Sequence, residues 1–144
     1  MMHRVFVALL LACATGAAAC TGSSTSPSTT VTTTAPTSEY FTGTLAPGTS
    51  QFYTFTVTGG GAVAVTLVST QTARIGGTVG ARLDVGVGVP LGPGCAVTSS
   101  AVVTPGLSAQ VSTNGTASAV YCVNVADPGV LATDTLFVVR VSHT

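Results

Sequence analysis

Residues 51–58 read QFYTFTVT, and this stretch decides the fold of the chain. Tyr53, Phe55 and Val57 occupy alternate positions, so in an extended strand their side chains lie on one face. Phe52 and the intervening threonines form the opposite face. A period of two over this length predicts a strand with one buried face.

The same period recurs along the rest of the chain. Four further runs show it: AVAVTLVS (62–69), RLDVGVGV (82–89), ASAVYCVNV (117–125) and LFVVRVS (136–142). In RLDVGVGV the alternation groups Val89 with Leu83, Val85 and Val87 on the buried face. No stretch of this region has the pattern of an amphipathic helix, so the alternation predicts an all-β fold.

Clusters of glycine, proline and asparagine separate these runs at short intervals. Asn114-Gly115 is the strongest hairpin signal, because both residues tolerate a positive φ. It predicts a hairpin between strands at 107–112 and 117–125. We therefore predict one antiparallel β-sandwich domain of about eight short strands over residues 39–144.

Charge is scarce in this chain of 144 residues. Charged residues make up 6% of it, against about 25% in ordinary soluble domains. The formal net charge is zero, which excludes the basic footprint of a nucleic-acid-binding protein. A surface of threonine, serine and glycine gives little repulsion between copies and favours self-association.

The first twenty residues have the three parts of an export signal. Arg4 lies in a short positive region, and an apolar stretch of ten residues follows at 5–14. That stretch is too short to span a bilayer, which takes about 20 residues. Small alanines at 17–19 then precede Cys20. This pattern predicts a signal peptide over residues 1–20 and an exported protein.

Small residues before Cys20 and a Ser/Thr tract after it resemble the lipobox of bacterial lipoproteins. The resemblance implies that the Cys20 thiol is acylated and anchors the mature protein in a membrane. Thr21 in place of aspartate implies the outer membrane where the cell has two membranes. Ala17 departs from the leucine that is usual there, and Cys13 offers a looser match. The alternative is cleavage after Ala19 and free secretion.

Residues 21–38 read TGSSTSPSTTVTTTAPTS. Thirteen of these eighteen residues are serine or threonine, and none is charged. Because almost nothing here is apolar, burial of side chains could not offset the conformational entropy lost on ordering the segment. The composition predicts a disordered tether that lifts the domain off a membrane.

Two cysteines fall inside the predicted domain. Cys95 lies by the Gly92-Pro93-Gly94 turn signal and Cys122 lies in a predicted strand. Because an exported chain meets oxidising conditions, we predict a Cys95–Cys122 disulfide. A metal site is the weaker alternative, since neither a histidine nor a third cysteine accompanies the pair.

Four segments together resemble the bacterial pre-peptidase C-terminal (PPC) domain. They are YFTGTLAPGTSQFYTFTVTGGGAVAVTLVS (40–69), LDVGVGV (83–89), VYCVNVADPG (120–129) and LFVVRVSHT (136–144). The resemblance covers nearly all of residues 39–144 and implies a small jelly-roll-like β-sandwich attached to secreted proteins. Such domains usually accompany a hydrolase, whereas here the domain follows a lipoprotein-like signal.

The sequence offers few groups for catalysis. His143 is the one histidine outside the signal, and a histidine at a strand end is more often structural than a base. Asp127 precedes Pro-Gly and is expected to accept backbone N–H bonds in a turn. Calcium binding by Asp127 and Asp134 is a weak alternative, because calcium prefers oxygen ligands. We predict a non-enzymatic protein without a cofactor.

Two functions of different classes then remain. The first is an envelope-anchored module that binds another envelope component or a ligand, for which Asp84, Gly86 and Gly88 offer an outward strip. A bulge or a covering segment is the plainer explanation of those glycines. The second is a self-associating subunit of a surface layer or fibre, since the strand edges have few charges that would prevent pairing between copies. Glycan binding is less favoured because the chain has no tryptophan.

Overall fold

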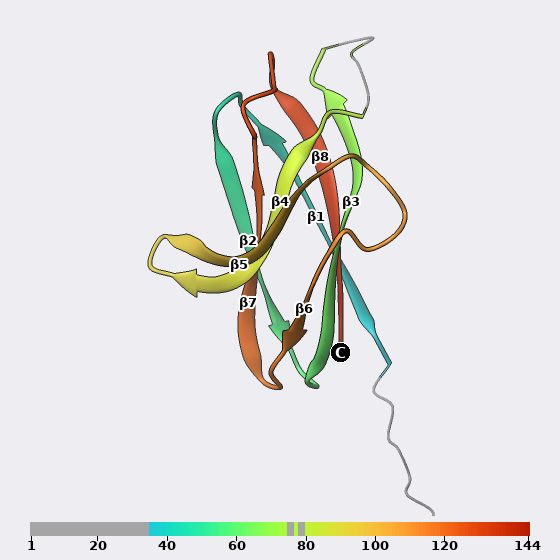
Figure 1. The fold of residues 1–144 in the computed structure, drawn as a ribbon, viewed down its shortest axis with the longest axis vertical. Coiled ribbons are helices and arrows are strands. Elements are labelled where there is room, and N and C mark those ends of the chain that lie inside the picture. Colours follow the sequence, from blue (N-terminus) through green and yellow to red (C-terminus); the bar gives the residue numbers. More distant parts are fainter. Residues whose placement is uncertain (1–34, 75–76, 78–79) are drawn as a thin grey trace, which may run out of the picture. The chain divides into compact units, whose positions relative to one another are not determined.

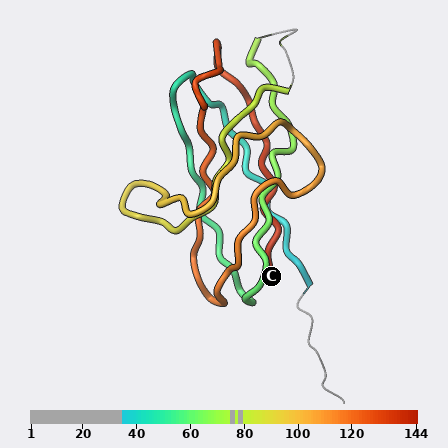
Figure 2. The backbone as a smooth tube through the Cα atoms, in the orientation of Figure 1, coloured from blue at the N-terminus to red at the C-terminus, as the bar shows by residue number. Residues whose placement is uncertain are grey.

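A computed structural model describes residues 35–74, 77 and 80–144 (Figures 1 and 2). The described residues form eight β-strands and no helix. The strands are β1 (Thr37–Leu45), β2 (Ser50–Val57), β3 (Gly61–Thr72), β4 (Leu83–Leu91), β5 (Gly94–Val103), β6 (Val111–Gly115), β7 (Ala119–Ala126) and β8 (Thr135–His143). β1 begins two residues before the predicted domain boundary, so Thr37 and Ser38 belong to the sandwich.

The strands form two four-stranded antiparallel sheets. The first sheet has the order β1-β8-β3-β6, and the second sheet has the order β2-β7-β4-β5. Every connection crosses from one sheet to the other except that between β4 and β5, which is a hairpin. Two interlocked four-stranded sheets of this order are a jelly roll. The prediction of an antiparallel, jelly-roll-like sandwich of eight strands is confirmed.

The core lies between the sheets and is built from the alternating positions that the sequence singled out. Each fully buried valine or leucine stabilises the fold by about 1.5–3 kcal/mol relative to an exposed one. The buried apolar residues are Leu45, Phe55, Val57, Val63, Val65, Leu67, Leu83, Val85, Val87, Val111, Val123, Val125, Phe137, Val139 and Val141.

The predicted Asn114-Gly115 hairpin is wrong. Gly115 ends β6, which pairs with β3 in the first sheet, whereas β7 lies in the second sheet between β2 and β4. The connection is therefore an arch between sheets, and the residue with a positive φ is Ser118, at 58°. A local turn signal gives no information on which sheet the following strand joins.

Among the described strands, the one hairpin is formed at Gly92-Pro93 between β4 and β5. Gly92 has a φ of 56°, as the first central position of a type II′ turn requires. A register shift between Val87 and Gly88 marks a β-bulge in this pair. Beyond the bulge Val89 is 44% exposed, so its predicted burial is wrong. Figure 1 shows this hairpin projecting from the side of the sandwich.

The seam between β1 and β2 is closed by side chains. The Tyr53 hydroxyl donates to the Thr42 carbonyl at 2.9 Å, and the Gln51 amide donates to the Thr44 carbonyl. Tyr53 also stacks on Phe41, with ring centroids 5.1 Å apart. Side chains of β2 therefore occupy backbone acceptors along the edge of β1.

Candidate functional site

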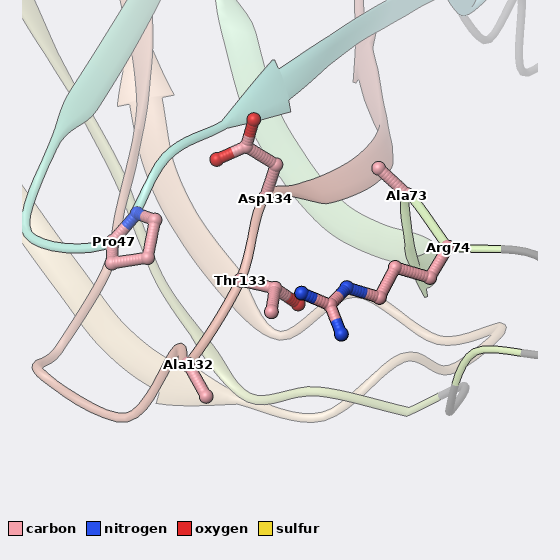
Figure 3. Close-up of a pocket in the computed structure, with 6 residues that line it drawn as sticks. All are labelled: Pro47, Ala73, Arg74, Ala132, Thr133 and Asp134. Atoms are coloured by element: carbon pink, nitrogen blue, oxygen red, sulfur yellow. The ribbon is translucent and has the colours of Figure 1, made fainter.

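A cleft of about 370 Å³ opens at one end of the sandwich (Figure 3). Three connections that are far apart in the sequence supply its lining: the β1–β2 turn, the segment after β3 and the segment before β8. The lining residues are Pro47, Ala73, Arg74, Ala132, Thr133 and Asp134. Figure 3 shows the Arg74 side chain extending in the direction of Thr133, while the Asp134 carboxylate points away from it. A cation and an anion therefore border one small opening.

The sheet pairing explains why these residues meet. β3 and β8 are antiparallel neighbours, and the pair ends at Thr72 opposite Thr135. The residues that follow β3 and precede β8 therefore lie side by side, and the Ala73 N–H donates to the Asp134 carbonyl at 2.9 Å. Sequence analysis did not single out Arg74, because its neighbourhood depends on this long-range pairing.

Asp127 fixes the loops beside the cleft. Its Oδ1 accepts N–H bonds from Gly129, Val130 and Leu131 at 2.8–3.1 Å, and its Oδ2 accepts one from Gly48 at 2.9 Å. One carboxylate thus joins the β1–β2 turn to the β7–β8 connection. The predicted role of Asp127 as a turn residue that accepts backbone N–H bonds is confirmed.

These bonds also change the acidity of Asp127. The Gly48 N–H has the largest effect, and the N–H groups of residues 129–131 add to it. Together they outweigh partial desolvation and hold the pKa of the Asp127 carboxyl below its ordinary value of 3.8. A lowered folded-state pKa means that the ionised form stabilises the fold.

Replacing Asp127 by alanine is expected to lower the melting temperature at neutral pH and to matter progressively less in acid. The contribution of the carboxylate is fully present above its unfolded-state pKa and is lost as the pH falls through the lower folded-state pKa. Thermal melts of the wild type and Asp127→Ala from pH 7 to pH 2 measure this convergence. Asp134→Ala is the control, since no hydrogen bond to its carboxylate occurs among the described residues. A difference between wild type and Asp127→Ala that stays constant with pH would contradict the assignment.

The calcium candidates Asp127 and Asp134 gain no support from this arrangement. Both oxygens of Asp127 face backbone donors, which a cation would have to displace. Within residues 35–74, 77 and 80–144, no group of three or more His, Cys, Asp or Glu side chains could hold a metal ion.

The opposite end of the sandwich contains a second pair of ionisable residues. His143 is 3% exposed and its Nε2 lies 2.8 Å from Glu39 Oε1. Its ring lies 5.4 Å from the Phe55 ring, and its Nδ1 has no hydrogen-bond partner among the described residues. His143 is the last residue of β8 and packs against Phe55 of the other sheet, so it is a strand-end residue with a structural place at the end of the core.

The predicted disulfide is present between Cys95 and Cys122. Cys122 pairs with Gly88 in the second sheet and is fully buried, and Cys95 of β5 is bonded to it with a Cα–Cα distance of 5.9 Å. The β4–β5 hairpin covers the glycine strip. A methyl group on Gly86 would lie 2.6 Å from Val97 Cγ1, and one on Gly88 would lie 2.7 Å from the Val97 Cα. The glycines therefore accommodate a covering segment together with a bulge, and they leave no open strip for a ligand.

Cys20, the signal peptide at 1–20 and nearly all of the predicted tether lie outside the described residues. The part of the chain that is described contains no helix long and apolar enough to cross a membrane. A scan against protein-family models and a search of curated proteins both find no match to this chain.

Proposed function

We propose that this chain is an exported, non-catalytic binding module that presents the cleft end of its sandwich to another component of the cell envelope. The observation that carries the proposal is the placement of its charges. Arg74, Asp127 and Asp134 border the cleft or fix its loops, and Arg82 and Asp84 lie at the start of β4. From Val85 to Ala126 the chain has no charged residue.

The cleft also lies opposite the point where the chain enters the sandwich. Thr37 pairs with His143 at one end of β1, and Leu45 pairs with Thr135 at the cleft end. β1 therefore runs from the point of entry to the cleft. In a protein that is lipidated at Cys20 and tethered through residues 21–38, the cleft would face away from the membrane. Loops at one end of a β-sandwich are a common place for recognition.

Two further observations support parts of the proposal. The Cys95–Cys122 disulfide is typical of proteins outside the reducing cytoplasm. The burial of His143 against Phe55 removes the one histidine of the described residues from the surface, which favours binding over acid–base chemistry. The jelly-roll order agrees with the expected PPC-like architecture, which remains a proposal for this chain.

The test is chemical crosslinking of the protein in its own envelope, followed by purification. Intact mass first reports whether Cys20 carries a lipid. We expect the wild type to recover a partner that the double variant Arg74→Ala, Asp134→Ala fails to recover. The control is Thr54→Ala, Thr56→Ala, which changes two exposed side chains of β2 and should recover the partner normally. Equal recovery by the cleft variant, or loss only in the β2 variant, would refute the cleft as the binding site.

A further inference from the structure

The edge strand β5 is the longest uncovered strand edge in the described structure. Nine of its ten residues pair with β4 on one side, Thr98 being the bulged residue, and no strand pairs with the other side. No side chain of the described residues hydrogen-bonds to its backbone. The other edges differ. β2 has eight residues and directs the side chains of Gln51 and Tyr53 to the edge of β1, which they occupy, and β6 has only five residues. An open row of N–H and C=O groups is a template for another strand.

β5 has one of the features that usually protect a strand edge, the bulge at Thr98, and lacks the others. Its sequence, GCAVTSSAVV, has no lysine, no proline and no charge. Charged side chains, prolines or a covering segment normally prevent edge-to-edge pairing in β-proteins. Val97 and Val102 are instead exposed on β5, and Val89 and Leu91 are exposed on the adjoining half of the hairpin. The edge therefore offers backbone hydrogen bonds together with apolar area.

The disulfide makes this edge rigid. Cys95 lies at the start of β5 and is bonded to Cys122 in the interior strand β7. A strand that is held in its extended conformation before binding loses less conformational entropy on pairing. The hairpin is thus ordered in advance for an added strand.

We infer that β5 is a homophilic docking edge, to which β5 of a second copy adds in antiparallel orientation. The absence of charge selects this partner. A charged strand would find only Asp84 as a charged residue in β5 and the part of β4 that pairs with it, whereas a second copy brings an equally uncharged β5 with matching valines. Antiparallel pairing of identical edges gives a closed two-fold dimer in which two four-stranded sheets become one continuous sheet. The inference does not depend on the cleft, which uses different residues.

Sedimentation equilibrium of the purified protein over a wide concentration range tests this dimer. We expect reversible dimerisation in the wild type and a dissociation constant raised on the order of tenfold or more in Val102→Lys, since a lysine on an edge strand opposes pairing. Val120→Lys is the matched control. Val102 and Val120 are 43% and 51% exposed on the same sheet, but Val120 lies on the interior strand β7. The control should dimerise like the wild type.

Hydrogen exchange gives a second readout that needs no substitution. Amides of β5 should exchange more slowly as the wild-type concentration rises, while amides of β2 should not change. A protein that is monomeric throughout, equal weakening by both lysine variants, or β5 exchange that is independent of concentration would each overturn the inference. Because the last measurement uses the wild type, the inference stays testable even where Val102→Lys fails to fold.

Discussion

Gly88→Ala is expected to lower the free energy of unfolding by about 2–4 kcal/mol, through overpacking that the surroundings cannot relieve. A methyl group at this position would overlap the carbonyl of Ala96 and lie 2.7 Å from the Cα of Val97. Both obstacles are backbone, so no side-chain rotation removes the clash. To accept alanine, β5 would have to move away from β4 at the bulge, close to Cys95, which the disulfide bonds to Cys122.

Urea denaturation of the wild type and Gly88→Ala measures the effect. Gly94→Ala, in the same hairpin, is the control, because its methyl group would come no closer than 3.8 Å to the Leu91 carbonyl oxygen. We expect Gly94→Ala to stay close to the wild type. Equal stability of the two alanine variants would show that the hairpin does not lie on Gly88 as described.

Removing the disulfide by Cys95→Ala together with Cys122→Ala is expected to cost about 3–4 kcal/mol, since the bond closes a loop of nearly thirty residues in the unfolded chain. The free energy of unfolding of this variant should not change when reductant is added. That of the wild type should fall on reduction by an amount similar to the loss in the variant. Undiminished stability after reduction of the wild type would contradict the entropic role of the bond.

The two changes should also be coupled. Without the disulfide β5 is freer to move away from β4, so a methyl group on Gly88 should be tolerated better. A double-mutant cycle would then show that the combined loss is smaller than the sum of the two separate losses. Additive losses of unfolding free energy would show that the disulfide does not hold β5 against Gly88.

The sequence predicts the layers of this fold well because alternation reports directly on burial. Phe55, Val57 and Val139 lie in the core, as their period-two positions require. The disulfide is also predictable, because only two cysteines lie in the domain. The pattern fails at Val89, because β4 pairs with β7 only as far as Gly88 and Val89 lies in the part of the hairpin beyond that pairing. The alternation of the sequence gives no sign of where this long-range pairing ends.

The pairing of strands that are distant in the chain could not be predicted from the sequence. Asn114-Gly115 has the chemistry of a hairpin turn, but the core needs β6 in one sheet and β7 in the other. The cleft has the same origin, since Arg74 meets Thr133 only because β3 lies beside β8. Asp127 was identified correctly because its turn chemistry is local, whereas its bond to Gly48 is not.

The position of β8 limits when this protein can fold. β8 lies between β1 and β3, so neither strand has that neighbour until the chain has been made as far as His143. Long-range pairing of this kind makes folding slow, because the entropy of closing a large loop is lost before the contacts that stabilise the pair can form. In a nascent chain that lacks β8, β1 therefore cannot join β3 and β6, and the first sheet cannot form as a whole. For a protein exported as proposed here, this delay would be useful, since a translocation channel that threads extended polypeptide would receive the chain before the jelly roll can close.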